Sequence, residues 1–114
     1  MEFTHKENGP IDIIYLVGEL ELYSSPFLQE KLDELLAKNR KKTILCLKEL
    51  AFVDSSGLKL FFEGAKRAKL DSNCYFIFTD INSAIAHVFN LGGFHNLCTI
   101  FPRVEDAIKF LEGL

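Results

Sequence analysis

The stretch LKELAFVDSSGLKLFFEGAKRAK, residues 47–69, contains the junction from which the fold of this chain can be predicted. The preceding run TILCL and its continuation up to Val53 are apolar and rich in residues that favour strands. From Leu58 onward, apolar residues recur at i, i+3, i+4, i+7 and i+10, which indicates an amphipathic helix. The pentapeptide VDSSG, Val53–Gly57, is therefore predicted to join a buried strand to a helix.

The polar residues of VDSSG have a structural and a functional interpretation. One of Asp54, Ser55 or Ser56 can cap the first backbone N–H groups of the helix, and Gly57 can let its first turn pack closely. A cap needs only one of these three side chains. The other polar side chains are then available for chemistry, although capping residues alone are common at helix starts.

Upstream of this junction, the sequence predicts a β-hairpin and a helix. Asn8-Gly9 separates the strand-like runs EFTHK and IDIIYLV and favours a hairpin turn, but Pro10 argues for a slightly longer or irregular loop. Ser25 is placed to cap the next helix and Pro26 to occupy its first position. Leucines at helical spacing extend this helix to about residues 39–40.

Downstream, two further strand–helix units are predicted. CYFIF, Cys74–Phe78, is a buried strand, and Asp80 and Asn82 can cap a short helix that Gly92-Gly93 would end. CTIF, residues 98–101, is a last short strand. The remaining apolar residues have helical spacing and predict a terminal helix.

The predicted element order is ββαβαβαβα, in a single domain that spans residues 1–114. Strands that are separated by single helices must cross over to lie parallel. The predicted fold class is therefore α/β, with a mixed sheet: an antiparallel N-terminal edge hairpin, then parallel strands, with about four helices. Binding sites in such sheets gather where strands end and helices begin, and VDSSG lies at one such junction.

Composition agrees with one compact domain. The chain has 114 residues, 48% apolar and 25% charged, and a formal net charge of -3, which lacks the basic footprint of a nucleic-acid binder. Its three cysteines form no Cys-x-x-Cys pair, and we expect them to be reduced, buried thiols. The sequence shows no recognisable signal peptide or membrane-spanning run, so the expected location is the cytoplasm.

The motifs of common enzymes and ligand sites are absent from the sequence. It has no Gly-x-Ser-x-Gly elbow, no Walker-type phosphate loop and no His-x-x-x-His pair. His5, His87 and His95 are scattered, and we assign them no role. The basic run at residues 39–42 is expected to complement a helix dipole rather than to bind nucleic acid. We therefore expect neither enzymatic activity nor a cofactor or metal.

The stretch from Leu47 to Lys69 resembles the central signature of STAS domains, in particular that of bacterial anti-sigma-factor antagonists. In those proteins a strand ends in Asp-Ser-Ser-Gly-Leu and the next helix continues to a basic segment. Gly18-Glu19-Leu20 resembles the Gly-(Glu/Asp)-(Leu/Ile) that ends the family's second strand. FNLGGF, Phe89–Phe94, is similar to the family's Phe-x-x-(Ser/Thr)-Gly-Leu. The resemblance covers roughly residues 11–111.

Three positions depart from the family pattern. Glu21 stands where the family often has Asp, Lys59 where it often has Gly, and Gly92 where Ser or Thr is usual. Lys59 would project from the first turn of the helix after VDSSG. We expect it to affect the choice of partner more than the fold.

The resemblance implies a phosphorylation-dependent partner switch. By position, Ser55 is the serine that is phosphorylated by a partner kinase, which is itself the anti-sigma factor. With Ser55 in this role, we expect Ser56 to be the N-cap of the helix. The unphosphorylated antagonist binds this kinase and releases the sigma factor, and a PP2C-type phosphatase restores that form. The partner-binding residues would be Glu19, Glu21, Asp54, Ser56, Gly57 and Lys59.

An alternative function belongs to another class. The chain could be a non-switching STAS subunit of a lipid-transport ATPase or of a stress-sensing complex. The same surface would then be a permanent docking site.

Overall fold

The computed structural model describes residues 1–93 and 96–114. Its strands are β1 (Glu2–Asn8), β2 (Ile11–Leu20), β3 (Lys42–Val53), β4 (Tyr75–Thr79) and β5 (Thr99–Phe101). Its helices are α1 (Ser25–Ala37), α2 (Ser55–Leu70), α3 (Ser83–Gly92) and α4 (Val104–Glu112). The element order ββαβαβαβα is the predicted one, and strands β4 and β5 each begin one residue later than expected.

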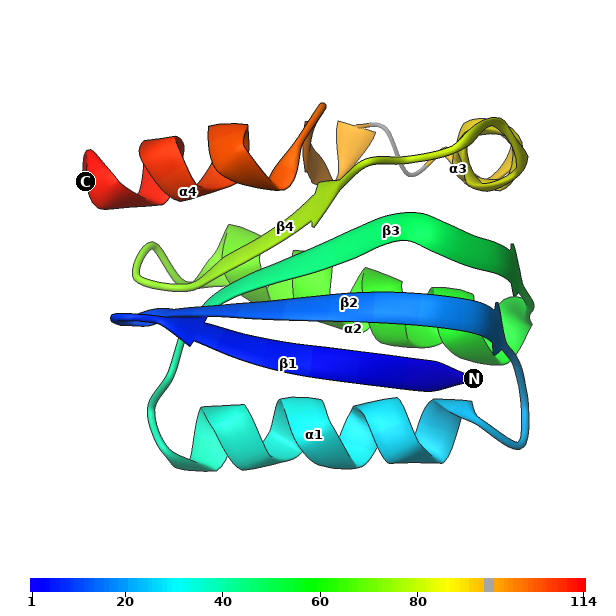
Figure 1. Cartoon of the computed structure of the whole chain (residues 1–114), viewed down its shortest axis with the longest axis horizontal. Coiled ribbons are helices and arrows are strands. Elements are labelled where there is room, and N and C mark those ends of the chain that lie inside the picture. Colours follow the sequence, from blue (N-terminus) through cyan, green and yellow to red (C-terminus); the bar gives the residue numbers. More distant parts are fainter. Residues whose placement is uncertain (94–95) are drawn as a thin grey trace.

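The five strands form one sheet in the order β1-β2-β3-β4-β5. Strand β1 is antiparallel to β2, and all the other neighbouring pairs are parallel. The predicted mixed sheet with an antiparallel edge hairpin is therefore confirmed. The turn of that hairpin lies at one end of the sheet, whereas β2 and β3 both end at the other, where α1 and α2 begin (Figure 1).

The core lies on both faces of the sheet because side chains along a strand alternate between its faces. In β2, Ile14 and Leu16 belong to the larger cluster, which also contains residues of α1, α2 and α3. Ile11 and Ile13 belong to a smaller cluster that packs against α4. The sheet thus lies between α4 and the other helices.

The hairpin turn differs from the prediction. Asn8 pairs with Ile11, so the loop contains only Gly9 and Pro10 and is not longer or irregular. Gly9 has a φ of 60°, and the ring of Pro10 holds its φ negative. A positive φ at the first loop residue only is the signature of a type II′ turn, which joins antiparallel strands well.

Both ends of α1 are fixed by local backbone bonds. The helix begins at Ser25 with Ser24 at the N-cap position, one residue earlier than predicted, so Pro26 is its second residue. At its end, Asn39 adopts a φ of 58°, and the N–H groups of Asn39 and Arg40 donate to the carbonyls of Leu36 and Leu35. This is the Schellman pattern of hydrogen bonds that ends many helices.

The buried and exposed aromatic residues of α2 agree with its helical geometry. Phe61 is fully buried and packs edge-on against Phe78, with ring centroids 5.1 Å apart, and against Phe89. The adjacent Phe62 is 44% exposed, as expected for residues about 100° apart around a helix.

The thiols behave largely as predicted. Cys46 and Cys74 are buried, whereas Cys98 is half-buried, and none forms a disulfide. Burial raises the pKa of all three, that of Cys98 to about 11, so they are protonated thiols at neutral pH.

Candidate functional site

VDSSG lies where two strand–helix connections meet at one end of the sheet. The backbone N–H of Asp54 donates to the carbonyl of Leu20 over 3.0 Å, which continues the pairing of β2 with β3 beyond Val53. The connection from β2 to α1 and the start of α2 are therefore held side by side (Figure 1). The connection that follows Leu20 and the first residues of α2 therefore form one surface at this end of the sheet.

Asp54 caps α2 and also holds the neighbouring connection. One carboxylate oxygen, Oδ1, accepts from the N–H of Gly57 over 3.1 Å. The other, Oδ2, accepts from the N–H of Leu22 over 3.1 Å. The expectation that Ser56 is the N-cap is wrong, because the helix begins at Ser55, two residues earlier than a cap at Ser56 would allow, which places Asp54 at the capping position.

Ser55 and Ser56 are the first two residues of α2. Ser55 is exposed and Ser56 is half-buried. Neither hydroxyl has a hydrogen-bond partner within residues 1–93 and 96–114. Since Asp54 already supplies the cap, both hydroxyls are available for another role.

Gly57 is required by packing inside the domain. It is buried, and a Cβ atom at this position would lie 2.6 Å from Cγ2 of Val53 and 2.8 Å from Cδ2 of Leu20. A normal side chain would force the start of α2 away from the strand ends. The structure thus accounts for Gly57 by packing, and its predicted contact with a partner stays a prediction.

Glu21 stabilises the connection between β2 and α1. Its carboxylate Oε1 accepts from the N–H of Ser24 over 2.9 Å, and the hydroxyl of Ser24 accepts from the N–H of Glu21 over 2.9 Å. This reciprocal pair has the geometry of a capping box. Glu19, by contrast, is exposed, and its carboxylate has no hydrogen-bond or ion-pair partner among the residues that the structure describes.

Lys59 lies on the exposed side of α2, one turn after Ser55. It lines an open groove of about 340 Å³ between the beginnings of α1 and α2. Ser56 and Glu63 of α2 and Pro26 and Gln29 of α1 also line this groove.

Exposed apolar residues beside Asp54 were not predicted. Leu22, Tyr23 and Phe27 are all more than half exposed, at the end of the molecule where Ser55 lies. The short helical turn at residues 21–25 holds them outward, because the N–H groups of Ser24 and Ser25 donate to the carbonyl of Glu21. An apolar pattern in the sequence does not reveal which of its residues remain in solvent.

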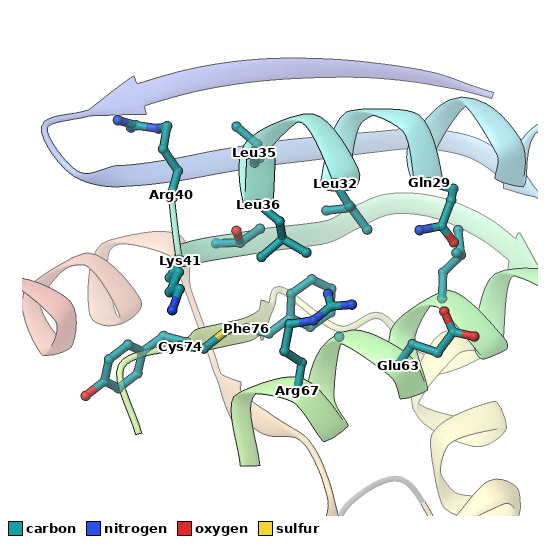
Figure 2. A pocket seen from close by; sticks show the side chains of 14 residues that line it. Gln29, Leu32, Leu35, Leu36, Arg40, Lys41, Glu63, Arg67, Cys74 and Phe76 are labelled. Carbon is teal, nitrogen blue, oxygen red and sulfur yellow. The ribbon is translucent and has the colours of Figure 1, made fainter. Parts of the chain in front are cut away.

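A pocket further along the same two helices is too small for a substrate. Figure 2 shows it between Leu32, Leu35 and Leu36 of α1 and Glu63 and Arg67 of α2. Its volume is about 30 Å³, space for one or two water molecules. We interpret it as a packing gap between the helices.

The other polar clusters have structural explanations. Asp12 is fully buried, and its carboxylate lies 2.7 Å from Nε2 of His5 and 2.8 Å from Nε of Arg40. His5, Glu7 and Asp12 place potential metal ligands within 4.8 Å of one another, but the guanidinium of Arg40 already supplies the positive charge. Lys41 of the same basic run pairs with Asp71 over 3.0 Å.

The other predicted features lie away from VDSSG. His87 is exposed on α3, and His95 lies outside the described residues. Asn82 caps α3 by accepting from the N–H of Ile85, whereas Asp80 accepts a bond from the thiol of Cys46 instead. Gly93, with a φ of 70°, ends α3, which confirms the interpretation of this glycine pair as a helix stop.

Comparison with known proteins gives the family. The family model described as the STAS domain matches residues 2–107. The chain belongs to the STAS domain family. Its DSSGL segment joins β3 to α2, GEL ends β2, and the described part of FNLGGF lies at the end of α3, so the three motifs of this STAS domain lie where the resemblance predicted.

Named relatives of this STAS domain include regulators of sigma factors. It is 26% identical over 104 residues to the anti-sigma-B factor antagonist of Bacillus subtilis (strain 168), covering 91% of this chain and 94% of the relative. The structure of protein tm1081 of Thermotoga maritima matches with a TM-score of 0.87 at 21% identity, covering 96% and 94% of the two chains. The Bacillus cell fate determinant SpoIIAA in its phosphorylated form matches with a TM-score of 0.75 at 20% identity, covering 96% and 99%. At these identities the structural matches show the fold alone.

No helix within the described residues is long and apolar enough to cross a membrane.

Proposed function

We propose that this STAS domain is an anti-sigma-factor antagonist whose binding is switched by phosphorylation of Ser55. It would act in the cytoplasm as a regulator without catalytic activity of its own. The observation that carries the proposal is an exposed serine hydroxyl at the first position of α2, directly after the capping Asp54, with no hydrogen-bond partner among residues 1–93 and 96–114. The family match and the relatives named as antagonists support it.

Ser55 is a better phosphoacceptor than Ser56 on geometric grounds. A kinase must bring its catalytic groups within hydrogen-bond reach of the hydroxyl. Ser55 is exposed at the end of the molecule, whereas Ser56 is half-buried in the groove between α1 and α2. Ser55 can be phosphorylated without moving either helix.

Phosphorylation at this position can change binding without changing the fold. A phosphoryl group adds about -1.5 to -2 charges. The start of a helix tolerates negative charge because its dipole and unpaired N–H groups are positive. At a docking surface, however, the dianion lies next to Asp54 and must lose water when the partner binds. A penalty of roughly 3 kcal/mol would weaken binding about a hundredfold.

The predicted partner-binding residues divide into two groups. Asp54 and Glu21 use their carboxylates to hold backbone N–H groups, and Gly57 is buried. We assign these three the role of positioning Ser55 and the neighbouring connection. Glu19, Ser56 and Lys59 have side chains that can reach a partner, and we assign them to direct contact.

The first test identifies the partner. The tagged protein is recovered from its native cell with and without phosphatase treatment, and bound proteins are identified by mass spectrometry. The proposal predicts an anti-sigma factor with a serine-kinase domain, enriched after phosphatase treatment. Recovery of only unrelated proteins contradicts it.

The second test locates the phosphoryl group. The captured kinase and ATP are incubated with the wild-type protein, Ser55→Ala and Ser56→Ala, followed by peptide mass mapping. Labelling should be lost in Ser55→Ala and retained in Ser56→Ala. If Ser55→Ala is labelled as well as wild type, the assignment fails.

The third test separates a switch from a permanent subunit. Ser55→Glu should lose affinity for the captured partner, and Ser55→Ala should keep it. Equal binding by both variants would favour the non-switching subunit of a transport or stress-sensing complex.

A further inference from the structure

Ser55 and Lys59 lie on the same exposed face of α2. Ser55 is the first helical residue, and Lys59 follows four positions later. Residues at i and i+4 of a helix are neighbours, with Cβ atoms about 5–6 Å apart. Both side chains are exposed, so nothing inside the domain blocks their approach.

Among the described residues, neither the Ser55 hydroxyl nor the Lys59 ammonium has a hydrogen-bond or ion-pair partner. Within the described part of the chain, Lys59 has no carboxylate within 4 Å of its Nζ, although Lys31, Lys38 and Lys41 each have one. Glu63 lies one turn beyond Lys59, but a lysine that precedes its glutamate is the weaker order for such a pair. Lys59 is therefore available to a negative charge placed at Ser55.

The carboxylate of Asp54 is held in place beside Ser55. Both carboxylate oxygens of Asp54 accept backbone N–H groups, from Gly57 and from Leu22. Its fixed negative charge repels a phosphoryl group from the strand side of Ser55. The side that remains is the helix face that carries Lys59.

We propose that Lys59 is an intramolecular counter-charge that holds the phosphoryl group of Ser55 once it is added. This inference rests on the proposed phosphorylation of Ser55. The order is the favourable one, because the anion lies on the N-terminal side and the cation one turn later. A phosphate–ammonium contact is also a charge-assisted hydrogen bond.

The pairing gives phosphorylation two effects on the surface. It adds a dianion at Ser55, and it withdraws from the surface the ammonium group that Lys59 presents in the unphosphorylated form. A partner whose acidic group contacts Lys59 loses that contact when Ser55 is phosphorylated. A partner could thus distinguish the two states by the loss of the Lys59 ammonium as well as by the phosphoryl group added at Ser55.

The test places phosphoserine at position 55 by genetic encoding, so that no kinase is needed. The second pKa of the phosphoryl group is measured by ³¹P NMR titration in the otherwise wild-type protein and in Lys59→Gln. An ammonium in contact with the phosphoryl group, with the two charges about 4 Å apart in water, should lower this pKa by about 0.7 pH unit, a fivefold change in proton affinity. The difference should shrink as salt is raised.

Lys66→Gln is the matched control. Lys66 is exposed on the same helix, and the substitution removes the same charge. It lies eleven residues after Ser55 in the sequence, which is about 16 Å along the helix axis and beyond the Debye length of about 8 Å at physiological salt. Lys66→Gln should leave the titration unchanged.

An unchanged phosphoryl titration in Lys59→Gln, or an equal change in Lys66→Gln, overturns the inference. The fold of each variant is checked by circular dichroism, and both lysines are exposed, so loss of structure is not expected. The result does not depend on whether the cell phosphorylates this protein. The titration therefore tests the pairing with Lys59 alone. Whether a kinase phosphorylates Ser55 is decided separately, by peptide mass mapping.

Discussion

Replacement of Asp54 by alanine tests how the site is built. The substitution removes two hydrogen bonds at once, those to the N–H groups of Gly57 and Leu22. Loss of a helix N-cap costs about 1 kcal/mol. Loss of a second bond to a charged acceptor costs about 1 kcal/mol or more. We therefore expect Asp54→Ala to lower the free energy of unfolding by about 2 kcal/mol.

The matched comparison is Ser56→Ala, since Ser56 was the cap that the sequence favoured. Its hydroxyl makes no hydrogen bond within the described residues, so we expect a change below about 0.5 kcal/mol. Asp54→Asn should fall between the two, because asparagine caps helices as well as aspartate does but has one acceptor oxygen instead of two.

Urea unfolding monitored by circular dichroism measures these free energies, with the slope of the transition as a check on two-state behaviour. Amide hydrogen exchange then locates the effect. In Asp54→Ala, the amides of Leu22 and Gly57 should exchange faster, while those of β4 change only as much as global stability does. If Ser56→Ala is as destabilising as Asp54→Ala, or if the Leu22 amide is unaffected in Asp54→Ala, the described geometry is wrong.

Three further predictions concern other parts of the molecule. Gly57→Ala should destabilise by about 1–3 kcal/mol in urea unfolding, because its Cβ would overlap buried side chains; an unchanged midpoint would contradict the packing. Arg40→Ala should destabilise the protein more than Lys38→Ala in urea unfolding, because it removes the guanidinium from the fully buried carboxylate of Asp12 and leaves His5 beside it, whereas the pair of Lys38 with Glu34 lies in solvent. Equal effects of the two substitutions would refute this difference. The raised pKa of Cys98, about 11, means that the folded state holds this proton more tightly than the unfolded chain does. Stability should therefore fall as pH rises from about 9 towards 11, and Cys98→Ala should flatten that decline.

The element order could be predicted because it depends on periodicity along the chain. The apolar residues after Leu58 have helical spacing and TILCL does not, so VDSSG was correctly placed between a strand that ends at Val53 and the helix that follows it. The parallel order of the strands followed from the single helices between them. The first inference uses only the spacing of apolar residues, and the second uses the general rule that a helix between two strands lets them lie parallel, so the sequence is sufficient for both.

The capping residue could not be predicted because three polar residues compete for one position. A shift of one residue in the helix start exchanges the roles of Asp54, Ser55 and Ser56, and that start is set by contacts to Leu20 and Val53. The bond from Leu22 to Asp54 spans 32 residues and exists only in the folded chain. The Glu21–Ser24 pair is local, but it reverses the Ser/Thr-x-x-Glu/Gln order of a capping box, so the usual sequence signature does not identify it.

The acidic residues near Ser55 show why position in a motif does not by itself give a role. Asp54 and Glu21 were grouped with Glu19 as partner-binding residues, yet their carboxylates are occupied by backbone N–H groups and hold the two connections together. A substitution at either residue would disturb partner binding through the position of Ser55, even if neither touches the partner. Exposed Glu19 and Lys59 then remain for direct electrostatic recognition, together with half-buried Glu63 in the groove beside Lys59. A phosphoryl dianion that pairs with Lys59 reverses the local charge at this surface, so the departure at Lys59 bears on the switch and not on the fold.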